Sequence, residues 1–158
     1  MLGGKSMHDF WYFIILLVVA FIGLNYFLHS LKKKNLEKIK EELKLVGEVE
    51  SVKEIYDFNL KVNNESYMIK VIYAANLKEV SFNSKKHWQV SNSSGSKMLD
   101  TKGFEELTGR KIVLIYPKPE RVLRYINENE VVFVKPSMDV FGMTVLSMSE
   151  LRDYFKTI

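Results

Sequence analysis

The stretch FWYFIILLVVAFIGLNYFLHSL, residues 10–31, organises the rest of the chain. Its twenty-two residues include no Asp, Glu, Lys or Arg. A helix of this length rises about 33 Å at roughly 1.5 Å per residue, which is enough to cross a hydrocarbon core of about 30 Å. Aromatic residues stand near both ends, where amphipathic rings prefer the lipid headgroups. The stretch is therefore predicted to be a single transmembrane helix.

A cleaved secretory signal is the competing interpretation of an apolar segment near an N-terminus. Such a signal has a basic beginning, an apolar core of about 7 to 15 residues and a small-residue cleavage site. Here Lys5 is the only Lys or Arg before the stretch, the apolar core is longer, and no A-x-A-like site follows. These features favour an anchor that is retained.

The charges on either side of residues 10–31 predict how the chain is oriented. Residues 1–9 are short and read as an exposed tail, whereas Lys32, Lys33 and Lys34 follow the apolar stretch directly. Because basic residues stay on the cytoplasmic side, the N-terminus is predicted to be outside the cell membrane and the remainder in the cytoplasm. The three lysines are also expected to attract anionic lipid headgroups, at about 1 kcal/mol each.

The formal charge of +4 is unevenly distributed along the 158 residues. Residues 32–46 hold six lysines and three glutamates, whereas residues 47–158 are close to neutral with sixteen Lys and Arg against fifteen Asp and Glu. A strong phosphate binder would carry a basic patch on its folded part. A protein partner is therefore favoured, with nucleic acid as the alternative.

The composition also restricts the chemistry. The chain has no cysteine, which excludes a disulfide framework, a thiolate nucleophile and a cysteine metal site. Its three histidines are scattered at positions 8, 29 and 87. No cofactor and no metal site is predicted from the composition.

Residues 32–46, KKKNLEKIKEELKLV, are predicted to form an amphipathic helix. Leu36, Ile39, Leu43 and Val46 recur at spacings of three and four, which places them on one helical stripe. A coiled-coil dimer is one use for such a stripe, but two heptads fall short of the three or four that support it. We expect the stripe to pack on the domain that follows.

The first half of residues 47–158 has a strand pattern. Segments 49–62, 67–74 and 79–90 are rich in β-branched and aromatic residues, and Asn63-Asn64 suits a tight hairpin turn. We expect these segments to form a three-stranded meander. The polar segment 91–102 is predicted to be a loop, and residues 103–107 a short helix.

The second half is predicted to mix strands and helices. KIVLIY, residues 111–116, reads as a buried central strand, followed by a helix from Pro119 to Ile126 and a strand over residues 131–134. A last strand over residues 143–147 precedes a helix capped by Ser149. The sequence therefore predicts a small α/β domain with a mixed sheet, and α+β is the alternative class.

Asp57, Met68-Ile69-Lys70 and Trp88-Gln89 stand on or after successive predicted strands. With the order of elements, they resemble the restriction-endonuclease-like superfamily, and within it the nuclease-related domain often called NERD. In that family an Asp and a Glu-x-Lys bind a divalent metal and orient the attacking water. The resemblance implies a nuclease-like fold over residues 42–155, with Asp57 and Lys70 in the site.

Met68 is a departure from that pattern, because it stands where the family has its metal-binding Glu. A thioether is a poor substitute for a carboxylate toward Mg²⁺. The resemblance therefore implies an inactive site. Glu65 supplies the alternative, a migrated carboxylate that would complete a Mg²⁺-dependent site with Asp57 and Lys70.

Two further groups are candidate binding residues. Lys85, Lys86, His87 and Trp88 combine basic and aromatic side chains, as single-stranded nucleic-acid sites do. Arg121 and Arg124, one turn apart on the predicted helix, are candidates for a small anion patch, and a solvated helix face is the competing interpretation.

The function predicted from the sequence is that of a single-pass membrane protein whose cytoplasmic, inactive nuclease-like domain acts as a binding or scaffolding module. One alternative is a membrane-tethered, metal-dependent nuclease. The other is an accessory subunit of a larger membrane complex.

Overall fold

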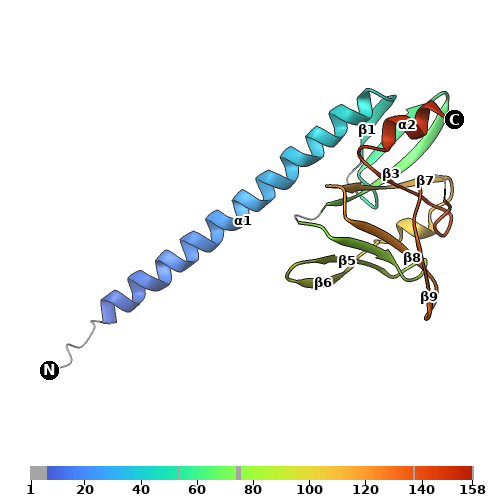
Figure 1. Ribbon diagram of the computed structural model, residues 1–158. Helices are drawn as coiled ribbons and strands as arrows, with labels where there is room; N and C mark the ends of the chain where they lie inside the picture. The colour runs from blue at the N-terminus through green and yellow to red at the C-terminus, as the bar shows by residue number, and fades with distance from the viewer. Residues whose placement is uncertain (1–6, 53, 74–75, 137, 158) are drawn as a thin grey trace. The chain divides into compact units, whose positions relative to one another are not determined.

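The apolar stretch lies in a long helix, α1, which spans Met7–Lys44 (Figure 1). The computed structural model describes residues 7–52, 54–73, 76–136 and 138–157. The large apolar side chains of residues 10–31 are more than a third exposed, apart from the partly buried Ile14. Within the described residues, α1 is the one helix long and apolar enough to cross a membrane. The predicted tail is wrong for residues 7–9, which are helical; residues 1–6 lie outside the described residues.

The chain divides into two units, residues 1–38 and 39–158, and the boundary falls inside α1. In the second unit Ile39 and Leu43 have no exposed surface. The expectation that the apolar stripe packs into the domain is confirmed for these two residues. The domain therefore begins at Ile39 rather than at the predicted Gly47.

Five strands form the first sheet of the domain. They are β1 (Glu48–Ser51), β2 (Phe58–Val62), β3 (Glu65–Tyr73), β7 (Arg110–Tyr116) and β10 (Thr144–Ser147), in the order β1-β2-β3-β7-β10. β7 lies between β3 and β10 and runs parallel to both. Asn63 and Asn64 join β2 to β3 with positive φ of 51° and 64°, which confirms the predicted hairpin turn.

Five further strands form the second sheet. They are β4 (Glu79–Phe82), β5 (Trp88–Asn92), β6 (Gly95–Leu99), β8 (Arg121–Asn127) and β9 (Glu130–Phe133), in the order β6-β5-β4-β8-β9. β4 and β8 run parallel, and the other neighbours are antiparallel. The domain is thus α+β with two mixed sheets, which corrects the α/β assignment in favour of its alternative.

The main core lies between the two sheets. The buried side chains of Ile72, Val113 and Val145 from the first sheet belong to one cluster with Phe82 and Trp88 from the second. Phe104, from the 3₁₀ helix η1 (Phe104–Glu106), joins the same cluster.

The helix α2 (Leu151–Lys156) packs on the other face of the first sheet. The Tyr67 ring of β3 meets that of Phe155 in α2 edge to face, with centroids 5.1 Å apart. Ile69 and Ile112, paired in register on β3 and β7, are buried on the same face as Tyr67. This face and the core between the sheets together bury the first sheet on both sides.

The predicted helix from Pro119 to Ile126 is wrong, because residues 121–127 form β8. The spacing of Val122, Leu123 and Ile126 suits a helix, but Val122 pairs with Val80, 42 positions earlier, in the parallel β4–β8 ladder. This tertiary pairing overrides the local pattern.

Two smaller predictions are also corrected. The predicted loop 91–102 contains β6, which forms a hairpin with β5. Ser149 does not cap α2, since the N-cap residue is Glu150, whose carboxylate instead accepts a hydrogen bond from the Ser147 N–H at 2.8 Å. The predicted strands over 111–116, 131–134 and 143–147 are confirmed to within one residue.

Candidate functional site

Asp57 and Lys70 lie close together. The Asp57 N–H donates to the Ile69 carbonyl at 2.9 Å, and its Oδ2 accepts the Val71 N–H at 2.7 Å, so Asp57 is held on both sides of residue 70. The Lys70 ammonium donates to the Ile55 carbonyl at 2.8 Å. The Oδ2 of Asp57 and the ammonium of Lys70 are thus both engaged by backbone groups.

The pKa of Lys70 is lowered, chiefly because the side chain is partly buried, while the Asp57 carboxylate works in the opposite direction. Its Nζ also lies 5.7 Å from the centroid of the Phe104 ring. The ammonium is therefore partly withdrawn from solvent, beside the Phe104 ring.

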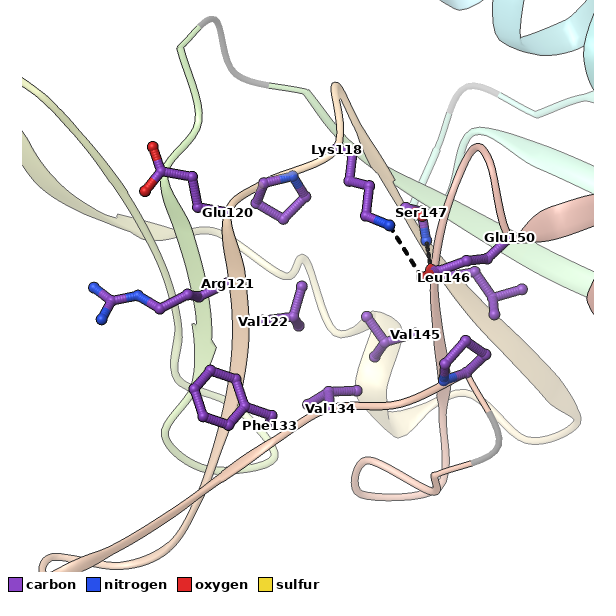
Figure 2. Close-up of a pocket in the computed structure, with 12 residues that line it drawn as sticks. Lys118, Glu120, Arg121, Val122, Phe133, Val134, Val145, Leu146, Ser147 and Glu150 are labelled. Carbon is purple, nitrogen blue, oxygen red and sulfur yellow. Dashed lines mark hydrogen bonds and ion pairs between the residues drawn. The ribbon is translucent and has the colours of Figure 1, made fainter.

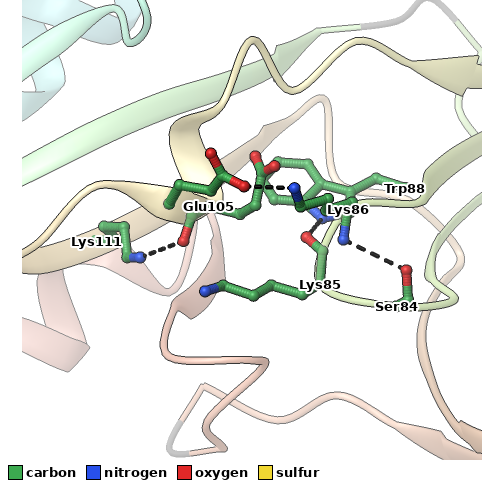
Figure 3. A network of polar contacts seen from close by, with 7 residues as sticks. Ser84, Lys85, Lys86, Trp88, Glu105 and Lys111 are labelled. Carbon is green, nitrogen blue, oxygen red and sulfur yellow. Dashed lines mark hydrogen bonds and ion pairs between the residues drawn. The ribbon is translucent and has the colours of Figure 1, made fainter.

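Lys111 is a buried lysine that the sequence reasoning missed. It stands opposite Met68 in the β3–β7 ladder and is 9% exposed. Its ammonium donates to the carbonyl of Glu105 at 2.8 Å (Figure 3). It also donates to the carbonyl of Leu107 at 2.8 Å. Burial lowers its pKa, and the charge of Lys85 adds to the effect. Lys111 therefore fastens η1 to the first sheet.

Glu105 completes this interior cluster of charges. It is 3% exposed, and its Oε2 has no hydrogen-bond partner in the part of the chain that the structure describes. Because residues 68, 70 and 72 of β3 share a face with residues 111 and 113 of β7, Lys70 and Lys111 both belong to the side of the first sheet that faces the second. The sequence did offer one indication that Lys111 is buried, namely its position at the start of an apolar strand.

Glu65 lies apart from Asp57 and Lys70. It is five residues from Lys70 along β3, which is roughly 17 Å at about 3.4 Å per residue, and the odd spacing turns it to the opposite face. Its carboxylate pairs with the Arg110 Nε at 2.9 Å. Among the described residues no group of three or more His, Asp or Glu side chains could hold a metal ion. Of the three residues proposed for a migrated nuclease site, Asp57 and Lys70 are therefore together and Glu65 is apart from them.

The basic and aromatic group at residues 85–88 is also divided (Figure 3). Trp88 is fully buried against Phe82 and Phe104, and its indole N–H donates to the Lys85 carbonyl at 2.9 Å. It is therefore a core residue, which corrects its prediction as a stacking surface for bases.

The polar members of that group stay at the surface. Lys86 pairs with Glu106, whose hydrogen bond raises the pKa of the lysine. His87 Nδ1 lies 2.8 Å from Ser84 Oγ.

Arg121 and Arg124 do not form the predicted patch. They are three residues apart on a strand, so they point to opposite faces. Arg121 pairs with Glu79 at 2.8 Å, and Arg124 donates to the Asp139 carbonyl at 2.7 Å with its guanidinium 4.6 Å from the Phe141 ring centroid. The prediction fails because it assumed a helix.

A pocket of about 160 Å³ opens where the first sheet meets the β8–β9 hairpin (Figure 2). Val122, Val134 and Val145 line it, and Lys118 and Glu150 pair beside it at 3.6 Å. Burial would raise the pKa of Glu150, but hydrogen bonds from Ser147 and the charge of Lys118 outweigh it, so the pKa is lowered. Residues at β8, β9 and β10 line the pocket, so it could not be predicted from the sequence without knowing how these strands are arranged.

The β8–β9 hairpin next to this pocket is unusually apolar for a surface. Ile126 is 53% exposed, Val131 41% and Phe133 65%. Val131 pairs with Tyr125 and Phe133 with Leu123, so these side chains share one face of the second sheet; Leu123 is only 9% exposed there, whereas Val131 and Phe133 are open to solvent. Contiguous exposed apolar side chains of this kind are typical of interaction surfaces.

No protein-family model matches the chain, and neither a curated protein nor a solved structure is significantly similar to it.

Proposed function

We propose that the chain is a single-pass membrane protein that holds a small binding domain at the cytoplasmic surface of the cell membrane. Residues 10–31 carry this proposal, because their apolar side chains surround α1 and none of its most apolar window is buried. Left in water, such a surface would be strongly unfavourable, at roughly 25 cal/mol per Å². A bilayer is the environment that accepts it.

Chain length supports a position of the domain close to the lipid. Residues 32–38 separate Leu31 from the buried Ile39. Whatever their conformation, these residues span at most about 29 Å, at roughly 3.6 Å per residue. The domain is therefore confined near the headgroups, where Lys32, Lys33 and Lys34 attract anionic lipids.

Binding of a protein is better supported than catalysis. Asp57 and Lys70 are tied to backbone groups, and Glu65 is on another face of the sheet. The folded part is close to neutral, which does not favour nucleic acid. The exposed apolar hairpin formed by β8 and β9 offers the surface that a protein partner needs.

Extraction and labelling test the anchor and its orientation. Washing membranes with alkaline carbonate should leave the full chain in the pellet. A membrane-impermeant thiol reagent should label a Ser6→Cys variant in intact cells, and should label Met98→Cys, at a 48% exposed side chain, only after permeabilisation. Release by carbonate, or labelling of Met98→Cys in intact cells, would contradict the proposal.

Photo-crosslinking tests the binding surface. A photoreactive residue at Phe133 should capture a protein in cells, whereas the same residue at Met98, which lies at the opposite end of the second sheet, should capture much less. Equal capture at both positions would remove the β8–β9 hairpin as the binding surface.

A further inference from the structure

β9 is an edge strand with an unprotected, apolar border. It ends the β6-β5-β4-β8-β9 order and has no strand on its other side within the described residues. Edge strands in soluble domains are normally guarded by charges, Pro or burial, because their free backbone groups invite another strand. The side chains of β9 are Glu130, Val131, Val132 and Phe133, of which Val131 and Phe133 are exposed.

The three other edges of the two sheets are better protected. β1 carries Glu48 and Glu50, and β6 carries Gly95, Ser96 and Lys97. Residues 145–147 of β10 are buried. β9 is therefore the edge most open to pairing.

The pairing of β9 with β8 determines which of its backbone groups are free. The Val134 N–H donates to the Val122 carbonyl at 2.9 Å, and in an antiparallel ladder the bonded residues alternate. Val132 and Val134 therefore direct their backbone groups toward β8, while Val131 and Phe133 direct theirs to the open edge. The residues with exposed apolar side chains are also those with free N–H and C=O groups.

This arrangement is complementary to itself. If two β9 strands pair antiparallel with Val132 on the two-fold axis, Val131 of each lies opposite Phe133 of the other, and each such pair can exchange both of its hydrogen bonds. Shifting the register by two residues in one direction would use the Lys135 carbonyl, which already accepts the Met138 N–H at 2.9 Å. Shifting it in the other direction would use the Asn129 N–H, which already donates to the Asn127 Oδ1 at 3.0 Å. The register centred on Val132 needs neither group.

Charge supports the antiparallel direction. Glu130 begins β9. In the antiparallel register it lies opposite Val134 of the other chain, so the two Glu130 side chains stand at opposite ends of the junction. Parallel pairing would instead place the two Glu130 side chains side by side.

We propose that the partner of the β9 edge is a second copy of this chain, joined through antiparallel β9 strands into a continuous ten-stranded sheet. This inference rests on the proposed function, because it names the protein that the membrane-held domain binds. Val131 and Phe133 are then covered by each other across the junction.

The chain has no cysteine, so single cysteines report the pairing directly. At a non-hydrogen-bonded antiparallel pair the Cα atoms are about 4.5 Å apart, within the roughly 4.4–6.8 Å that a disulfide spans. Mild oxidation of full-length Val132→Cys in its native membrane should convert most of the protein to a disulfide-linked pair of chains. Met98→Cys, on the opposite edge strand, should stay as single chains.

A mixed experiment tests the register. Val131→Cys and Phe133→Cys chains that carry different tags should link to each other when expressed together, because these positions are opposed at about 5.5 Å. Val131→Cys alone should link poorly. Adding Phe133→Glu to Val132→Cys should reduce the linked fraction severalfold, since it places two carboxylates at the junction.

The outcomes separate this proposal from the proposed function. If Val132→Cys links no better than Met98→Cys, or links to a different protein, the second copy is wrong, while a carbonate-resistant chain would keep the membrane anchor. If carbonate also releases the chain, the proposed function fails as well.

Discussion

Glu42, near the end of α1, and Arg152, in α2, form an ion pair with Oε2 and Nη2 2.6 Å apart, 110 positions apart in the sequence. The pair connects the two helices of residues 39–158 and lies beside the buried Leu43. Both side chains are partly exposed, which limits the energy of the pair, whereas Leu43 is fully buried.

The first prediction compares these two contributions. Leu43→Ala should lower the free energy of unfolding by about 2–5 kcal/mol, because it removes a buried side chain and leaves a cavity. Arg152→Ala should cost less than about 1 kcal/mol, as exposed ion pairs do. Urea denaturation of the full chain in detergent, with Trp11 replaced by Phe so that fluorescence reports Trp88, measures both. Equal losses would show that α1 is not part of the domain core.

The second prediction concerns Asp57. Asp57→Ala should lower the free energy of unfolding by about 1–3 kcal/mol, because the Val71 N–H loses its acceptor. Asp57→Asn, which keeps a carbonyl oxygen, should lower it less. The same urea experiment measures the difference.

A nuclease assay gives Asp57 an independent test. The full chain with Mg²⁺ or Mn²⁺ should not cut DNA or RNA above the level of Asp57→Ala. Metal-dependent cleavage that disappears in Asp57→Ala would support the tethered nuclease and contradict the binding module.

The third prediction uses the lowered pKa of Lys70. The folded state binds the proton of the Lys70 ammonium less tightly than the unfolded state does. At a pH below the folded pKa, the charged ammonium therefore makes folding less favourable. Stability contributed by this group rises with pH from the folded pKa toward the ordinary value of 10.5.

Lys70→Met isolates that contribution. Between neutral pH and about 10.5 the stability of the natural chain relative to Lys70→Met should increase as the pH rises. Urea midpoints of the two proteins at matched pH measure the difference. A difference that stays flat or falls would contradict the burial of the ammonium.

The fourth prediction concerns η1. Lys111→Met keeps the length of the side chain but leaves the carbonyls of Glu105 and Leu107 without their donor. The amides of residues 104–107 should then exchange hydrogen faster, with a loss of about 1–3 kcal/mol of stability. Lys85→Met, at an exposed position nearby, is the matched control and should leave exchange in η1 unchanged.

The fifth prediction tests the lysines next to the apolar stretch. Replacing Lys32, Lys33 and Lys34 by Gln should raise the fraction of chains with the domain outside, because the bias toward basic residues inside is reduced. Thiol labelling of Met98→Cys in intact cells measures that fraction. If orientation does not change, other features of the chain determine it.

Local patterns were sufficient for some elements and not for others. The apolar helix, the Asn63-Asn64 turn and the 111–116 strand follow from features within a few residues of each other. The identity of β8 depends on its parallel ladder with β4. Because residues 119–126 were predicted to be a helix, Arg121 and Arg124 were wrongly expected to lie on one face. Nothing within residues 119–126 indicates the strand that pairs with them.

The site was predictable to a similar extent. Asp57 and Lys70 meet because a short turn brings the start of β2 beside β3, which the hairpin pattern implies. The position of Lys111 above Glu105, and the pocket beside β10, depend on contacts between β7, η1 and the second sheet. Such contacts depend on side-chain burial in three dimensions, and a lysine that begins an apolar strand can equally well face water.

Because Ile39 and Leu43 complete the interior of the domain while belonging to the same helix as the apolar stretch, the segment after residue 38 is part of the fold rather than a linker. A protease that cut between Lys40 and Gly47 would separate Ile39 from the domain, and Leu43 as well if it cut after that residue. If α1 is the membrane anchor that we propose, release of the domain and loss of its native state would be a single event, and a fragment that begins at Gly47 would lack part of its own interior.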